Sequence, residues 1–159
     1  MYVVHLILKS LWFILPAYVA NGTPVLLGGG PPMDFGRKFF DGRRILGDGK
    51  TWRGFLVGLI AGAIVGILQG RLEAGLFLSL GALIGDFLGS FFKRRWGLKS
   101  GALAPGLDQL EFLVAALVLV SIVESPTWRV VAVLLIITPA IHLSTNFLSY
   151  KLGFSSSPY

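Results

Sequence analysis

Residues 39–62 read FFDGRRILGDGKTWRGFLVGLIAG, and the chain changes character within this stretch. Its first part carries charged side chains of both signs, and from Gly54 onward it carries none. Such a change is typical of the boundary between an aqueous loop and a membrane helix. A topology anchor gains nothing from acids that cancel its charge, so the mixed signs indicate a further role for the loop.

The rest of the chain repeats this contrast. Of its 159 residues, 54% are hydrophobic and 14% are charged, whereas about a quarter are charged in a typical soluble domain. Five apolar stretches approach the roughly 20 residues that a bilayer core requires: residues 2–20, 54–70, 72–92, 110–123 and 130–150. We therefore expect an all-α integral membrane protein with five transmembrane helices. Residues 1–159 would form one membrane-embedded domain, with long loops at about 22–53 and 93–108.

The net charge of +6 raises the question of a nucleic-acid partner. Most basic residues instead lie in the two long loops, which share one side of the membrane if there are five spans. The positive-inside rule makes that side cytoplasmic. We therefore expect a multi-pass cell-membrane protein that binds no nucleic acid, with its N-terminus outside and its C-terminus in the cytoplasm. The absence of cysteine excludes disulfides, thiolate metal sites and a cysteine nucleophile.

Glycine recurs at every fourth position in two neighbouring apolar stretches. Small residues at this spacing leave a groove in which another helix can approach closely. We expect the two stretches to pack tightly against each other through these glycines: Gly54, Gly58, Gly62, Gly66 and Gly70 in one, and Gly81, Gly85 and Gly89 in the other.

Asp86 lies inside a span that carries no other charge between Glu73, at its start, and its basic end. A carboxylate at membrane depth costs roughly 2.5–3.5 kcal/mol on insertion scales, so a functional role is the default interpretation. Ser90, Lys93 and Arg94 follow on the same helix face. The alternative is a salt bridge that merely neutralises the acid.

Asp108 opens the fourth predicted helix, and Glu111 follows one turn later. Asp108 alone is compatible with a simple N-terminal cap. A hard divalent cation, however, needs several oxygen ligands, and Asp86 with Asp108 would supply them at one cytoplasmic mouth. Because basic residues surround this mouth (Lys93, Arg94 and Lys99), the pattern predicts a magnesium-polyphosphate site.

The opening stretch fits the same chemistry. Arg43, Arg44 and Lys50 offer donors for phosphate oxygens. The interleaved acids, Asp34, Asp41 and Asp48, would orient the arginines or ligate a second metal. The stretch is not a Walker A loop, because the glycine that this motif requires five residues before its Gly-Lys pair is absent. The alternative is that these basic residues serve only as topology anchors and lipid-headgroup contacts.

Polar residues also occur in the first and last predicted helices. Asn21 ends the first, and Asn146 shares a face of the last with His142 and Thr145. Two roles remain open for them: an interhelical hydrogen bond, or a place in the wall of a substrate cavity.

Four motifs together resemble the archaeal CDP-archaeol synthases over nearly the whole chain. They are NGTP from Asn21, DFGRKFFDGRRILGDGKTWRG from Asp34, GDFLGSFFKRRWGLKSGALAPGLDQLEF from Gly85, and IHLSTNFLSYKLG from Ile141. The GKTW motif from Gly49 and the residue order between Gly85 and Asp108 also resemble the larger phosphatidate cytidylyltransferases. The chain departs from their bacterial signature by lacking a His-Gly-Gly and by having Gln109 where arginine is expected.

The resemblance implies transfer of a cytidylyl group from CTP to 2,3-bis-O-geranylgeranyl-sn-glycerol 1-phosphate, an unsaturated archaeal ether lipid. The products would be CDP-archaeol and pyrophosphate, with Mg²⁺ as cofactor. In the phosphatidate cytidylyltransferases the acids of the Gly-Asp and Leu-Asp pairs hold the metal, and these acids correspond to Asp86 and Asp108 here. The expected catalytic residues are Asp86, Asp108, Lys50 and Lys93. The expected substrate-binding residues are Asn21, Asp41, Arg43, Arg44, Asp48, Thr51, Ser90, Arg94, Lys99 and Asn146.

Two other functions compete with this one. A CDP-alcohol phosphotransferase also uses membrane-embedded acids with magnesium, but its signature requires Asp-Gly, two residues and then Ala-Arg. Asp41-Gly42 is followed by Arg43-Arg44-Ile45-Leu46, so that pattern fails. The second is a transporter or anion-binding membrane protein that uses the basic mouth for binding alone.

Overall fold

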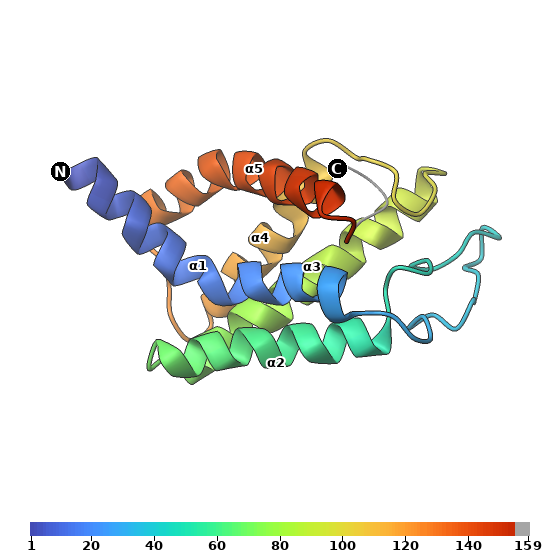
Figure 1. The fold of residues 1–159 in the computed structure, drawn as a ribbon, viewed down its shortest axis with the longest axis horizontal. Coiled ribbons are helices and arrows are strands. Elements are labelled where there is room, and N and C mark those ends of the chain that lie inside the picture. Colours follow the sequence, from blue (N-terminus) through green and yellow to red (C-terminus); the bar gives the residue numbers. More distant parts are fainter. Residues whose placement is uncertain (155–159) are drawn as a thin grey trace.

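The computed structural model describes residues 1–154, and these form five α-helices (Figure 1). The expectation of an all-helical chain is confirmed. This architecture suits a membrane, because a helix satisfies its backbone hydrogen bonds internally where no water is present. The helices are α1 (Tyr2–Leu27), α2 (Trp52–Leu68), α3 (Leu72–Arg95), α4 (Leu107–Val120) and α5 (Trp128–Lys151).

The helices differ in length. Three of them, α1, α3 and α5, are long and apolar enough to cross a bilayer. The other two are shorter, with 17 residues in α2 and 14 in α4. The two longest connections are residues 28–51, which hold eight charged side chains, and residues 96–106, which hold Lys99.

The first helix continues past Asn21, where the sequence suggested its end. Thr23 donates its hydroxyl to the carbonyl of Val19 at 2.6 Å, and the chain stays helical to Leu27. Gly28 then donates its backbone N–H to the carbonyl of Pro24 at 2.9 Å. Asn21 is therefore part of the helix wall rather than of a loop, because an apolar environment favours continued backbone hydrogen bonding.

The two ends of the bundle carry different features (Figure 1). Residues 28–51 project at one end, beside the end of α3 and on the same side as the end of α5. The N-terminus, the turn from α2 to α3 and the connection from α4 to α5 lie at the opposite end. The chain therefore gathers its long charged connections at a single end.

The glycine stripe of α2 packs against both α1 and α3. A Cβ atom at Gly58 would lie 2.6 Å from the backbone oxygen of Ala20 in α1. At Gly66 it would lie 2.8 Å from the Cα of Gly75 in α3. The predicted close approach of α2 and α3 is confirmed at this second point.

The glycines of α3 behave differently from the prediction. Gly81, Gly85 and Gly89 face α4, where Cβ atoms would meet Ala116, Phe112 and Glu111. The expectation that they pack against α2 is wrong. Gly81 is six residues after Gly75, which at 3.6 residues per turn places it about 120° away around the helix. One helix thus presents glycine to two partners.

The buried core joins α1, α3, α4 and the first half of α5. Ile14, Leu78, Leu113 and Leu134 are fully buried in it. All the buried residues of α5 (Val130, Leu134 and Thr138) precede Pro139. The second half of α5 therefore stands at the edge of the core, and the space beside it forms part of a pocket.

Candidate active site

A cavity of about 390 Å³ lies at the end of the bundle that carries the charged connections. Its walls come from all five helices, the segment around Lys50 and residues Gly101 and Ala102. This volume falls within the usual range for small-molecule sites. The lining mixes apolar rings with a few charged groups, as such sites commonly do.

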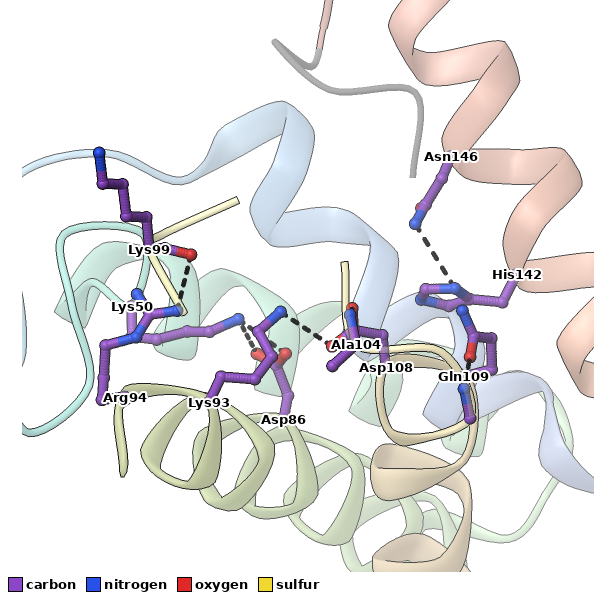
Figure 2. Close-up of polar contacts among 11 residues, drawn as sticks. Lys50, Asp86, Lys93, Arg94, Lys99, Ala104, Asp108, Gln109, His142 and Asn146 are labelled. Carbon is purple, nitrogen blue, oxygen red and sulfur yellow. Dashed lines mark hydrogen bonds and ion pairs between the residues drawn. The ribbon is translucent and has the colours of Figure 1, made fainter. Parts of the chain in front are cut away.

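Two lysine–carboxylate pairs line this cavity. The ammonium Nζ of Lys50 lies 2.7 and 2.6 Å from the two carboxylate oxygens of Asp86. Lys93 donates from Nζ to Asp108 Oδ1 at 2.8 Å. Figure 2 shows the two lysine head groups converging on the acids from different elements. Residues that are distant in the sequence therefore meet, and both predicted acids face the same cavity.

Asp108 does not cap its helix. The N-cap position of α4 is Gly106, whose backbone N–H is bound by Gln109 Oε1 at 2.5 Å. Asp108 Oδ2 instead accepts the backbone N–H of Ala104 at 2.8 Å. The carboxylate is thus held by the preceding connection on one side and by Lys93 on the other.

Glu111 is a third carboxylate in the same cavity, and the sequence did not predict it as a site residue. Its Oε2 atom is buried and has no hydrogen-bond partner among the described residues. Gly89 makes room for it, because a Cβ there would lie 1.6 Å from that oxygen. The signal in the sequence was the spacing of three from Asp108, which puts both acids on one helix face.

These three carboxylates are the oxygen ligands that a hard divalent cation prefers. Within residues 1–154, no three acidic or histidine side chains converge tightly enough to hold an ion as they stand. Asp86 and Asp108 each face a lysine instead. The unpartnered oxygen of Glu111 and the carboxylate chemistry of all three acids fit a metal ion, provided that Lys50 and Lys93 leave Asp86 and Asp108 for other partners.

Four of the polar residues predicted to bind substrate also line the cavity: Asn21, Thr51, Ser90 and Asn146. Thr51 additionally caps α2 by accepting the Gly54 N–H at 3.1 Å. The side-chain amide of Asn146 lies 3.4 Å from Nδ1 of His142, whose ring stacks on Phe112.

The remaining predicted residues lie outside the cavity lining. Arg44 binds Asp48 at 2.8 Å and Asp34 at 2.7 Å. Arg94 donates to the backbone oxygen of Lys99 at 2.9 Å, and the Lys99 side chain points away from both lysine–carboxylate pairs (Figure 2). The other two, Asp41 and Arg43, contact the end of α3.

Asp34 organises the 28–51 connection from within. Its buried carboxylate accepts two hydrogen bonds from Arg44 and three from the backbone N–H groups of Gly36, Leu46 and Gly47. Burial raises the pKa of Asp34, but these hydrogen bonds outweigh it and hold the pKa well below its usual range. The segment just before Lys50 is therefore fixed rather than loose.

The fold and the cavity together define a class: a multi-pass helical membrane protein with a pocket lined by charged side chains. The CarS-like family model, described as CDP-archaeol synthase, matches residues 3–159. The chain belongs to the CDP-archaeol synthase family.

Relatives and a solved structure agree with this assignment. The chain is 47% identical to CDP-archaeol synthase of Pyrococcus furiosus, over 98% of this chain and 99% of that protein. It is 51% identical to the Pyrococcus horikoshii protein of the same name, over 96% and 97%. A solved structure described as an intramembrane enzyme for archaeal membrane lipids biosynthesis superposes with a TM-score of 0.82 at 42% identity. That match covers 88% of this chain and 94% of the other.

Proposed function

We propose that this protein transfers a cytidylyl group from CTP to 2,3-bis-O-geranylgeranyl-sn-glycerol 1-phosphate, giving CDP-archaeol and pyrophosphate. The name shared by the similar proteins supports this activity. The observation that carries the proposal is the single cavity lined by two lysine–carboxylate pairs and a third, unpaired carboxylate. Family membership favours this function over a CDP-alcohol phosphotransferase or a protein that only binds or transports anions.

The proposal includes a topology. All five helices would cross the membrane, with the N-terminus outside and the charged connections in the cytoplasm, where CTP is found. Support comes from the concentration of Lys and Arg at the end that carries residues 28–51 and 96–106. The shorter α2 and α4 would span by local thinning of the bilayer or by help from their flanking residues.

The reaction needs no general base from the protein. A phosphate monoester is mostly dianionic near pH 7, because its second pKa is about 6. One oxygen of the lipid phosphate would attack the α-phosphorus of CTP, forming a new P–O bond. The bond from that phosphorus to the bridging oxygen of the β-phosphate breaks, and its electron pair leaves with pyrophosphate.

The obstacle to this reaction is repulsion between two polyanions, and positioned cations relieve it. We assign Lys50 and Lys93 to the phosphates. Each would move from its carboxylate to a phosphate oxygen when substrates enter, which a compact ammonium on a flexible stem allows. Lys99, two residues before Gly101 in the cavity lining, would attract CTP towards the mouth.

The carboxylates released by the lysines, Asp86 and Asp108, would hold Mg²⁺ together with Glu111. When bound, the ion supplies charge neutralisation at the phosphates of CTP. Asn21, Ser90, Thr51 and Asn146 would contact the polar parts of the substrates within the same cavity.

The lipid would reach the cavity from the membrane. Tyr18 and Asn21 in α1 line it together with His142 and Asn146 in the second half of α5, which contributes no buried residue to the core. An opening between these two helix segments would admit the lipid phosphate from the side while its prenyl chains stay in the bilayer.

A reconstituted assay tests the proposal. Detergent-purified protein is incubated with CTP, Mg²⁺ and a panel of ether and ester lipid phosphates, and the nucleotide-lipid product is identified by mass. We expect CDP-archaeol, with one pyrophosphate released per lipid consumed. Excess chelator is expected to stop turnover, and added Mg²⁺ to restore it. Binding of CTP without pyrophosphate release from any lipid would contradict the enzyme assignment.

A further inference from the structure

The lysine that meets Asp86 arrives on a connection that is not part of any helix. Lys50 lies at the end of residues 28–51, whereas Asp86 and Lys93 belong to α3. The described structure fastens this connection to α3 at a second place, around Arg94 and Arg95. Asp86 and Arg95 are nine residues apart, which corresponds to about 13 Å along a helix.

Arg95 makes the first half of this fastening. Its guanidinium lies 5.0 Å from the ring centre of Phe39 in the connection and 4.8 Å from that of Phe91 in α3. Its Nε is 3.0 Å from Asp41 Oδ2, and its Nη2 donates to the backbone oxygen of Arg44 at 2.5 Å. A single side chain of the helix thus holds a ring, a carboxylate and a carbonyl of the connection.

Arg43 makes the second half in the opposite direction. Its Nη1 donates to the backbone oxygens of Arg94, at 3.4 Å, and of Arg95. Both carbonyls belong to the last turn of α3, where the regular i→i+4 bonding of the helix ends. The carbonyl of Arg94 also accepts the backbone N–H of Gly97 at 3.1 Å. A Cβ at Gly97 would lie 3.6 to 3.7 Å from this guanidinium, an ordinary contact distance, so the position favours glycine through its φ of +76° rather than through lack of space.

We propose that Arg43 and Arg95 form a reciprocal arginine latch, and that both are positioning residues for the reaction. Arg95 reaches from α3 to the backbone at residue 44, and Arg43 reaches from the connection to the backbone of α3. The side chain of Arg44 binds Asp34, and Asp34 in turn accepts the backbone N–H groups of Leu46 and Gly47, which lie shortly before Lys50. The latch thereby fixes the register of Lys50 against Asp86, and this role rests on the proposed function.

The test measures the connection itself as well as the activity. Arg95→Leu and Arg43→Leu are compared with wild type by hydrogen–deuterium exchange over residues 29–51 and by steady-state kinetics. Arg37→Gln is the matched control, because the Arg37 side chain is exposed in the same connection and has no bond to another described side chain.

We expect faster exchange over residues 29–51 in both latch variants and unchanged exchange in α1 and α5. Because a misplacement of about 1 Å can lower a rate about 100-fold, we expect kcat/KM for CTP to fall by about that factor. The KM for the lipid phosphate should change by less than about threefold. Arg95→Lys should recover part of the loss, because it keeps a positive charge near Asp41 but not the fork of donors.

Several outcomes would overturn the latch. One is wild-type exchange over residues 29–51 together with wild-type kinetics in both leucine variants. Another is faster exchange throughout the helices, which would show a general structural role; the melting temperature of each variant checks this. Failure of the proposed function is distinguishable, because then wild type itself makes no product while the exchange measurements remain interpretable.

Discussion

The cations that line the cavity are lysines, whereas those that hold the surrounding connection are arginines. Lys50 and Lys93 each pair with one carboxylate. Arg43, Arg44 and Arg95 each bind two or more groups, and most of these belong to the backbone or to a second charged side chain. Positive side chains thus have different roles in the two regions: lysines pair with carboxylates in the cavity, and arginines hold the connection in place.

The difference follows from the chemistry of the two side chains. A guanidinium presents five donors in a rigid fork, which suits it to holding several fixed acceptors at once. An ammonium is a compact point charge on a flexible stem, which can leave one acceptor for another. A site that must release its carboxylates when substrates arrive is better served by lysine. A connection that must stay in place is better served by arginine.

The largest expected effect comes from removing an acid from the cavity. In Asp86→Asn, Lys50 loses its carboxylate and the site loses the acid proposed as a ligand for the cation. We expect turnover to fall about 1,000-fold, as for the loss of a preorganised electrostatic group in other enzymes. Initial rates of pyrophosphate release measure this. Glu73→Gln, in the first turn of the same helix, is the control. Normal turnover of Asp86→Asn with Mg²⁺ would refute the metal assignment.

Exchanging one cation type for the other tests the comparison directly. Lys50→Arg keeps the charge but replaces a mobile ammonium by a fork that would bind Asp86 bidentately. We expect kcat/KM to fall about 100-fold, because the group that should move to a phosphate stays in place. If Lys50→Arg works as well as wild type, the distinction between the two regions has no catalytic meaning.

A smaller effect is expected at the centre of the arginine region. Asp34→Asn replaces one acceptor oxygen by a donor that faces other donors, which should lower the local stability of residues 29–51 by about 2 kcal/mol. Hydrogen exchange measures this. The Asp34 pKa is depressed in the folded state, so its contribution is complete above the unfolded pKa of about 4. It should disappear only as pH falls towards the lower folded value, and loss of protection already at pH 6 would contradict this.

The smallest effect is expected at the opposite end of the bundle. Arg71 binds Glu124 at 2.6 Å and lies over the ring of Phe13, and none of these three residues lines the cavity. Both partners are partly exposed, so Arg71→Gln should lower the stability by at most about 1 kcal/mol. Thermal unfolding measures this. A change in KM for CTP would show that the two ends are coupled.

The sequence predicts the helices well because their apolar stretches are long and sharply bounded. It does not predict which side of α3 meets which neighbour, since Gly75 and Gly81 look alike in the sequence. Their difference lies in the angle between them around the helix. The end of α1 was also missed, because Asn21 and Gly22 are weak helix formers that nevertheless remain helical in an apolar setting.

The sequence also predicts the chemical types in the site better than their contacts. Asp86 and Asp108 line one cavity, but each faces a lysine that sequence spacing cannot assign. The prediction that Arg43 and Arg44 bind phosphate stays a prediction, and sequence spacing could not show the long-range partners that they have in the structure: the α3 carbonyls and Asp34. Arg95 had no signal of its own, since its partners Phe39, Asp41 and Arg44 lie more than fifty residues earlier.

Gly89 has a consequence for anyone who engineers this protein. Replacing glycine by alanine inside a helix is a standard route to thermostability, with a gain of about 1 kcal/mol in helix propensity. At this position the new methyl group would meet the tip of a flexible glutamate, which can simply swing aside. The chain would fold, and its melting temperature would rise. The carboxylate of Glu111 would meanwhile have turned away from the cavity, so, if Glu111 has the proposed role, screening by melting temperature alone would select a stable protein with reduced activity.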